Sequence, residues 1–248
     1  MQKEFRPLVE ATAIYCKNYF ARRFLAFYLH GSVAAGDAVP NVSDLDCYVV
    51  ISEELTRADK QYLEQMEKDL QQKYPLVNGI HLAVHSVKEL AEDKFARFVL
   101  KYNSVLYLGS DIAEQLEGSG CGKAGPDRAM AKGRLAFARQ CFEQACNNEQ
   151  PACTGEIPKD TFYASRKYAR YFVILEGAYF LMSQNKFRSF AKEDVLSRLY
   201  QYTCGFEEEL GMARDVLENP EKAGITHEEF LRRIRPFVIW MFDRIEES

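Results

Sequence analysis

The chain has 248 residues, of which 47% are hydrophobic, so it can bury a large core and is long enough for two modest domains. Its net charge of -4 and its pI near 5.7 argue against a protein that binds nucleic acid through a basic surface. Small substrates, cationic ones included, are easier to reconcile with this charge.

The first predicted elements are a helix over residues 5–22, a strand over 24–29 and a second strand over 44–50. The helix is expected to pack one apolar face on a sheet. The residues of that face are Leu8, Ala11, Ile14, Tyr15 and Tyr19. Between the two strands lie a Gly-Ser turn at Gly31 and Ser32, a short helix expected over 33–36, and a loop rich in turn residues.

The second strand carries two carboxylates. Successive side chains of a strand point to opposite faces, so Asp44 and Asp46 are expected to project together while Leu45 and Cys47 enter the core. Two carboxylates on one face suit Mg²⁺, which takes its remaining ligands from water and from substrate phosphates. An Asp-x-Asp pair by itself is more often the solvated face of an edge strand, and it is the combination with the turn that favours a site.

The Gly31-Ser32 turn predicts a phosphate site. Gly31 has no side chain to keep a phosphate from its backbone N–H, and the Ser32 hydroxyl adds a donor where a helix is expected to begin. The turn would hold phosphate oxygens while the aspartates hold the metal. A nucleoside triphosphate is the expected ligand.

This ordered pattern resembles the signature of the polymerase-β-like nucleotidyltransferase superfamily, in which a hydrophobic strand and Gly-Ser precede Asp-hydrophobe-Asp. Within it, HGSVAAGDAVPNVSDLD is most similar to the aminoglycoside adenylyltransferases and their bacterial relatives. The resemblance implies Mg²⁺ at Asp44 and Asp46, and nucleotide contacts at Gly31, Ser32 and Ser43. It also implies transfer of a nucleoside monophosphate, AMP from ATP, to a hydroxyl of a small molecule such as an aminoglycoside.

The rest of the N-terminal half alternates between helices and strands. A charged helix is predicted over 56–74, with Leu63, Met66 and Leu70 as its inner stripe. A strand follows over 79–85, then a helix capped by Ser86 and Glu89 that runs to about residue 101. A strand over 104–108 and a short helix over 111–116 complete an α+β domain with a mixed sheet, residues 1–117.

Residues 118–126, GSGCGKAGP, have the composition of a linker. Beyond them only helices are predicted, over 127–146, 160–184, 192–202, 206–218 and 226–246. The last helix carries one apolar stripe and a proline, Pro236, which is expected to kink it. Residues 127–248 are therefore expected to form an all-α helical bundle domain. The stripe consists of Phe230, Ile234, Phe237, Met241 and Ile245.

The resemblance implies a third carboxylate on the strand over 79–85, but His81 stands at that position. A histidine accepts a proton near neutral pH yet supplies no negative charge to Mg²⁺. Three interpretations stay open: His81 is the general base, a carboxylate of the helical domain such as Glu176 is the base, or the protein binds nucleotide without turnover.

In the helical domain, SFAKEDVLSRL resembles the adenylyltransferase segment whose lysine reaches the nucleotide's phosphates across the interdomain cleft. The resemblance assigns that role to Lys192. A lysine near a helix start combines a mobile cation with unpaired backbone N–H groups, and both attract phosphate.

We therefore expect a Mg-dependent adenylyltransferase with a small-molecule acceptor. The alternatives are an impaired nucleotide-binding or partner-binding protein of the same fold and an enzyme that modifies a protein or RNA. Seven cysteines without a zinc spacing, and an N-terminus without a signal-peptide core, predict reduced thiols in the cytoplasm, with no membrane and no nucleic-acid partner. The oligomeric state is left open, a homodimer included.

Overall fold

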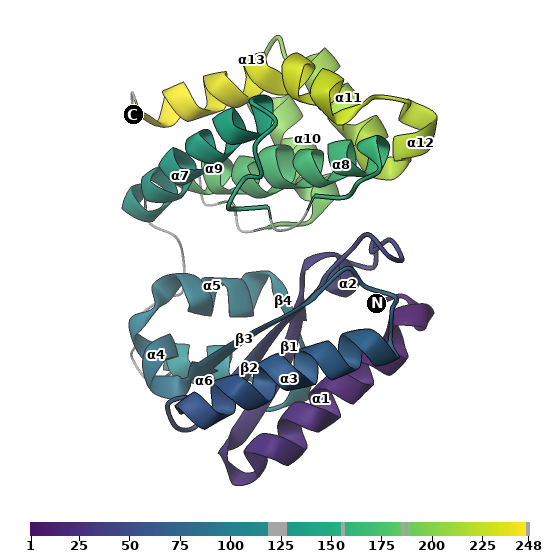
Figure 1. The fold of residues 1–248 in the computed structure, drawn as a ribbon. Coiled ribbons are helices and arrows are strands. Elements are labelled where there is room, and N and C mark those ends of the chain that lie inside the picture. Colours follow the sequence, from purple (N-terminus) through teal and green to yellow (C-terminus); the bar gives the residue numbers. More distant parts are fainter. Residues whose placement is uncertain (119–127, 155–156, 185–186, 188, 247–248) are drawn as a thin grey trace. The chain divides into compact units, whose positions relative to one another are not determined.

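The structure is a computed structural model that describes residues 1–118, 128–154, 157–184, 187 and 189–246 (Figure 1). The chain divides into two compact units, Met1–Gly125 and Pro126–Ser248. The predicted linker, residues 118–126, lies outside the described residues apart from Gly118, the last residue of a helix.

A four-stranded mixed sheet forms the centre of the first unit, with the strand order β3-β2-β1-β4. Strand β1 (Phe24–His30) is antiparallel to both β2 (Leu45–Ile51) and β4 (Ser104–Gly109), and β2 is parallel to β3 (Ile80–Ser86). The four predicted strands are confirmed to within one or two residues, and so is the expected α+β fold.

Helices cover both faces of this sheet (Figure 1). On one face, α1 (Arg6–Phe20) and α3 (Arg57–Lys73) pack against a core that includes the alternate residues Leu45, Cys47 and Val49 of β2. The other face carries a smaller core around Tyr28 and Val50. The helices of that region are α4 (Val87–Glu92), α5 (Lys94–Tyr102) and α6 (Ile112–Gly118), and short 3-10 turns, η1 (Lys3–Phe5) and η2 (Ala21–Arg23), flank α1.

The buried face of α1 differs from the predicted one. Ile14 and Tyr15 are 47% and 44% exposed, whereas Thr12 is fully buried and satisfies its hydroxyl by donating to the Leu8 carbonyl at 2.8 Å. The buried residues follow i, i+3 and i+4 steps that pass beside Ile14 and Tyr15. They are Leu8, Val9, Thr12, Ala13, Cys16 and Phe20.

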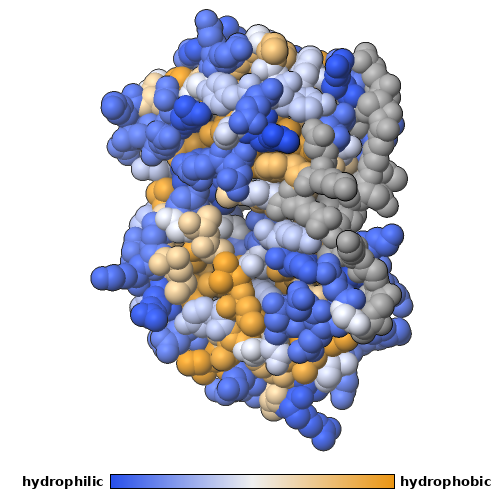
Figure 2. All heavy atoms as spheres, turned by 180° about the vertical axis from the view of Figure 1, so that it is seen from behind, coloured by the Kyte–Doolittle hydropathy of each residue, from blue (hydrophilic) through white to orange (hydrophobic). Residues whose placement is uncertain are grey.

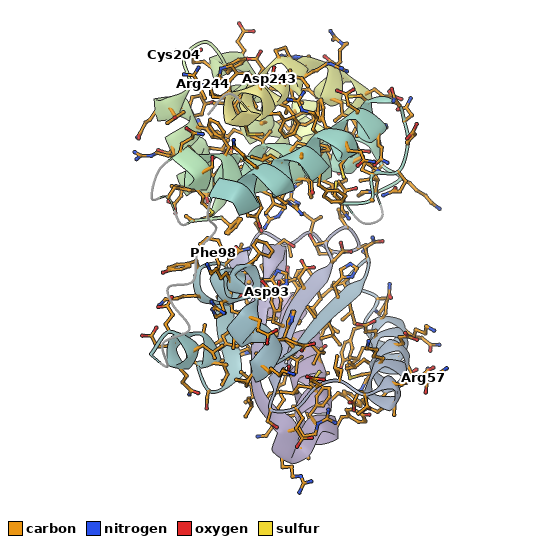
Figure 3. All side chains as sticks on the ribbon, turned by 90° about the vertical axis from the view of Figure 1, so that its left-hand side faces the viewer. Arg57, Asp93, Phe98, Cys204, Asp243 and Arg244 are labelled. Carbon is orange, nitrogen blue, oxygen red and sulfur yellow. The ribbon has the colours of Figure 1, made fainter. Side chains whose placement is uncertain are left out.

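The helix predicted from residue 86 to about 101 is two helices, and this prediction was wrong. Ser86 and Glu89 form the expected capping box at the start of α4. Asp93 then ends that helix, and its carboxylate accepts hydrogen bonds from the Phe95 and Ala96 N–H groups at 2.8 and 2.9 Å to start α5 (Figure 3). The buried Arg97 guanidinium donates to the Leu90 carbonyl at the end of α4.

Every regular element described in the second unit is a helix, as predicted. The helix predicted over 160–184 contains a π-helical segment, and Pro220 begins a short helix that was not predicted, capped by Asn219. The apolar stripe of the last helix is buried at Phe230, Ile234, Phe237 and Met241. The helices are α7 (Arg128–Cys146), α8 (Thr161–Tyr168), η3 (Ala169–Leu175, the π segment), α9 (Glu176–Gln184), α10 (Lys192–Tyr202), α11 (Glu207–Glu218), α12 (Pro220–Ala223) and α13 (His227–Glu246).

Candidate active site

One row of side chains crosses the sheet of the first unit at the end of β1. Asp46 on β2 is paired in register with His30 on β1 and with His81 on β3, and His30 is paired with Ser104 on β4. Residues paired in this way point to the same face of a sheet. The register therefore brings the second aspartate of the sequence motif beside two histidines that are far from it in the sequence.

Gly31 stands directly against the carboxylate of Asp46. Its φ of +68° belongs to the left-handed region, and a Cβ at this position would clash with Asp46 Oδ2. Gly31 is also the first residue of α2 (Gly31–Ala35), which begins two residues earlier than predicted. The chain therefore needs glycine here both for its backbone angle and for the space that the carboxylate occupies.

Asp44 precedes β2 and lies beside His81. The distance between Asp44 Oδ2 and His81 Nε2 is 3.8 Å, and the Asp44 carboxylate is the main reason that the pKa of His81 is raised. Asp46 raises the same pKa more weakly, which indicates that both carboxylates act on one imidazole. The structure thus brings together Asp44, Asp46, His81 and Gly31.

An aromatic row lies on the same face as Asp46. The Tyr48 ring lies between the rings of His30 and His85, with centroid distances of 4.7 and 5.5 Å. Burial lowers the pKa of His30 and raises that of Tyr48 to about 12, so both groups are neutral near pH 7. Tyr48 and His85 were not predicted to belong to the site, although each lies an even number of residues from Asp46 or His81 on its strand.

Ser43 shapes the loop before Asp44. Its hydroxyl accepts a hydrogen bond from the Val39 N–H at 2.8 Å, and its carbonyl accepts one from the Asn78 N–H at 3.0 Å. The first bond lies within the loop between α2 and β2, and the second ties that loop to the segment that leads into β3. Ser32 is buried in the first turn of α2, and its carbonyl accepts the Gly36 and Asp37 N–H groups.

Glu67 is a further acidic residue close to the site that the sequence analysis missed. It projects from α3, and its carboxylate accepts a hydrogen bond from the Leu82 N–H at 3.3 Å. Burial raises the pKa of Glu67, while His81 lowers it. Glu67 directly follows Met66, which was predicted to face the sheet. This neighbouring position is the sequence signal that could have indicated that Glu67 lies near the sheet as well.

The two candidate residues of the second unit occupy different environments. Glu176 is fully buried, and its Oε1 lies 2.9 Å from Arg134 Nη2. Burial raises the pKa of Glu176 to about 7. Lys192 is the first residue of α10, and its ammonium lies 3.3 Å from the Glu193 carboxylate.

The donor set of the site consists of two carboxylates. Within the part of the chain that the structure describes, no group of three or more His, Cys, Asp or Glu side chains is arranged to hold a metal ion. Two carboxylates are nevertheless the usual protein share of a Mg²⁺ site whose other ligands are phosphate oxygens and water. Asp44 and Asp46 fit such an ion chemically.

Comparison with known proteins finds a family model that matches part of the first unit. Residues 16–106 match the model described as "Nucleotidyltransferase domain", and this range contains all four residues of the row, His81, Asp46, His30 and Ser104. The first unit is similar to a nucleotidyltransferase domain over these residues. The resemblance to polymerase-β-like nucleotidyltransferases is thereby confirmed. Among the curated proteins that were compared, none matches the chain.

The fold of the chain is also found in a solved structure. It is the crystal structure of the spectinomycin adenyltransferase AAD(9) from Enterococcus faecialis with ATP and spectinomycin. The two chains are 13% identical, the alignment covers 97% of this chain and 99% of the other, and the TM-score is 0.55. The likeness therefore extends through the helical second unit as well. None of the described helices has both the length and the apolarity that are needed to cross a membrane.

Proposed function

We propose that the protein transfers AMP from ATP to a hydroxyl group of a small molecule and releases pyrophosphate. The acceptor oxygen forms a bond to the α-phosphorus, the bond from that phosphorus to the pyrophosphate oxygen breaks, and the hydroxyl proton leaves to a base. The observation that carries the proposal is the placement of the Asp46 carboxylate against Gly31, within a domain that matches the nucleotidyltransferase family.

Asp44 and Asp46 would hold the Mg²⁺ that this reaction needs. When bound, the ion would neutralise the charge that develops on the phosphate oxygens. The Asp46 carboxylate fills the space beside Gly31, and the first N–H groups of α2 would offer donors for phosphate oxygens next to it. Ser43 would contribute by holding the loop that places Asp44.

His81 is the base that the geometry favours. It lies beside Asp44 and in register with Asp46, at the position where the resemblance implies an acid. Glu176, the alternative, is fully buried and bound to Arg134. A buried carboxylate that already has a cation as its partner is poorly placed to take a proton from a substrate.

Lys192 is proposed to bind the triphosphate, as the resemblance implies. Its side chain is 17% exposed and its present partner is the exposed carboxylate of Glu193. Phosphate carries more charge than a single carboxylate and would compete well for this ammonium. A small cationic acceptor related to aminoglycosides fits the acidic chain, and the spectinomycin in the similar structure makes such compounds the first to test.

The test is pyrophosphate release from Mg-ATP in the presence of a panel of aminoglycoside and aminocyclitol hydroxyl compounds. Asp46→Asn and Asp44→Asn are expected to reduce release at least about a hundredfold, and His81→Ala by about a hundredfold or more. Asp69→Asn, which changes an exposed acid on α3, is the matched control and should keep full activity.

A second function is favoured by the histidine that replaces the third acid. A protein of this fold that binds ATP without turnover would show saturable Mg-ATP binding, weakened by Asp46→Asn, and no pyrophosphate release with any acceptor. Failure of both release and Mg-ATP binding would exclude both functions.

A further inference from the structure

The side-chain amide of Gln2 is bound to the backbone of the loop between α2 and β2. Its Nε2 donates a hydrogen bond to the Ala38 carbonyl at 2.8 Å, and its Oε1 accepts one from the Ala38 N–H at 3.0 Å. The contact extends along both segments, because a Cβ at Gly36 would lie 3.8 Å from the Met1 nitrogen. Figure 1 accordingly shows the N end of the chain beside α2. This loop leads from the predicted phosphate turn to the first aspartate of the candidate site.

The double contact distinguishes Gln2 from an ordinary surface glutamine. Polar side chains cover much of the visible face of each unit in Figure 2, and an amide on such a surface can bond to water alone. The Gln2 amide instead meets Ala38, which is 3% exposed and belongs to the same core as the fully buried Phe5. Among side chains of this length, only an amide donates and accepts at once at neutral pH. The contact therefore needs glutamine specifically.

Ala38 is followed directly by a tight turn that ends at Asp44. The Val39 carbonyl accepts the N–H groups of Val42 and Ser43 at 3.1 and 2.9 Å, and the Val39 N–H donates to the Ser43 hydroxyl at 2.8 Å. These three bonds make the segment one compact turn. Because such a turn moves as a unit, the position of Ala38 at its start sets the position of Asp44 at its end.

The turn is also held by the segment before β3. The Asn41 N–H donates to the Leu76 carbonyl at 2.8 Å, and the Ser43 carbonyl accepts the Asn78 N–H at 3.0 Å. Gln2 adds a tie from a different part of the chain, at the residue that precedes η1. Without the Gln2 amide, the turn keeps its bonds to the segment before β3 and loses those to the N-terminal segment. It should therefore shift rather than unfold.

We propose that Gln2 is a positioning residue for Asp44. Its amide fixes Ala38, the turn carries that position to Asp44, and the Asp44 carboxylate is thereby held beside His81, 3.8 Å from its Nε2. This role rests on the proposed function, in which Asp44 and Asp46 hold Mg²⁺. Asp46 lies on β2 and is placed by the sheet register, so loss of the Gln2 amide should weaken only the share of metal binding that comes from Asp44.

Magnesium dependence separates this role from a general loss of stability. Gln2→Met removes both hydrogen bonds at a similar side-chain length, and Gln2→Glu sets a carboxylate against the Ala38 carbonyl. In each variant, the Mg²⁺ concentration for half-maximal pyrophosphate release should rise about tenfold, and excess Mg²⁺ should restore the rate to within about twofold of the wild type. Gln65→Glu, which makes the same change of charge at an exposed glutamine of α3, is the matched control and should behave like the wild type.

Hydrogen exchange gives a readout that needs no metal and no turnover. In the protein without ligands, the backbone amides of residues 38, 39, 42 and 43 should exchange about tenfold faster in Gln2→Met than in the wild type. The first of these amides loses its acceptor, and the other three lie in the turn that Gln2 fixes. Amides of β1 and α3 should exchange at wild-type rates, which would exclude global unfolding as the cause.

A failure of the proposed function can be told apart from a failure of this role. If the wild type neither releases pyrophosphate nor binds Mg-ATP, the proposed function fails and the role of Gln2 fails with it. If it binds Mg-ATP without release, the Mg²⁺ titration is followed by binding, and the same shift of about tenfold is expected. In a wild type that is active or binds, three results would each overturn the role of Gln2 alone. They are an unchanged Mg²⁺ dependence in both Gln2 variants, a rate lowered equally at every Mg²⁺ concentration, and unchanged exchange of residues 38–43.

Discussion

At the scale of single residues, Gly31 is required both by its left-handed backbone angle and by the Asp46 carboxylate that lies against it. We expect Gly31→Ala to abolish measurable Mg-ATP binding, because the new methyl group would displace the Asp46 carboxylate. The left-handed backbone angle adds a cost of about 1–2 kcal/mol in the free energy of unfolding. Isothermal titration with Mg-ATP and urea denaturation measure the two effects.

Gly133 provides the matched control for this change. It lies exposed in α7, and a Cβ there would meet no atom within 4 Å. Gly133→Ala should therefore stabilise the protein by about 0.5–1 kcal/mol and leave nucleotide binding unchanged. Normal Mg-ATP affinity in Gly31→Ala would show that nucleotide binding does not depend on the position of the Asp46 carboxylate beside Gly31.

The site residues that could be predicted from the sequence are those that lie close together in the chain. Gly31, Asp44 and Asp46 lie within one strand-loop-strand segment, and the two-residue period of a strand is enough to place the aspartates on one side. Tyr48 and His85 were missed because their contact depends on the register between β2 and β3, which sequence spacing does not reveal. Glu176 looked available as a base only because its partner, Arg134, lies 42 positions away in the chain.

At the scale of elements, a partly buried ion pair ties the start of β1 to α3. Arg23 precedes β1, and its guanidinium donates two hydrogen bonds, at 3.1 and 2.9 Å, to the carboxylate of Asp59. The same carboxylate accepts the N–H and hydroxyl of Thr56 in the capping box of α3. Arg23 is the main reason that the pKa of Asp59 lies well below its ordinary value of 3.8.

Asp59→Asn should destabilise the first unit by about 2 kcal/mol at pH 7. A carboxylate whose pKa is lowered by folding contributes stability above its unfolded pKa and loses it as the pH falls through the folded pKa. The difference between wild type and variant should therefore be full at pH 7 and shrink below about pH 4. Urea denaturation over this pH range measures it, with Asp69→Asn as the exposed control on α3. A difference that is constant with pH would contradict the ion pair.

The start of a helix could be predicted from the sequence where a side chain within one turn caps it. Thr56, Ser86 and Asn219 each cap a helix by accepting the backbone N–H of the residue three positions ahead, and of these caps the one at Ser86 was predicted. The break at Asp93 was missed because the apolar periodicity continues through it. The π-helical segment η3 was missed as well, since it lies among tertiary contacts around Tyr171 that no local pattern encodes.

At the scale of the whole molecule, each unit has its own buried core, and in each unit a partly exposed arginine pairs with a buried carboxylate. The pair of the second unit joins Arg134 on α7 to Glu176 on α9, with the Arg134 guanidinium 5.4 and 5.5 Å from the ring centres of Tyr171 and Tyr179. The Arg134 Nη2 atom also donates to the Tyr171 hydroxyl at 2.6 Å. Both ion pairs connect elements within one unit, so each should affect the unfolding of its own unit only.

Arg134→Met tests this independence in the full chain. The variant leaves the Glu176 carboxylate buried without its cation, which typically costs 3–5 kcal/mol. Because burial already raises the pKa of Glu176 to about 7, and a protonated carboxyl carries no charge, the loss should be smaller at pH 5 than at pH 8. Arg134→Met with Glu176→Leu should recover most of the stability, and Arg139→Met, which breaks an exposed pair with Asp243, should cost less than about 1 kcal/mol.

Hydrogen exchange followed by mass spectrometry during urea denaturation distinguishes the units by their peptides. Arg134→Met should lower the midpoint for peptides of α7, α9 and α13 and leave those of β1, β2 and α3 unchanged, whereas Asp59→Asn should do the reverse. This outcome follows because each ion pair joins elements of one unit, and local stability is set by the contacts that must be broken together. If either variant shifted both sets of peptides equally, the two units would unfold as one cooperative body.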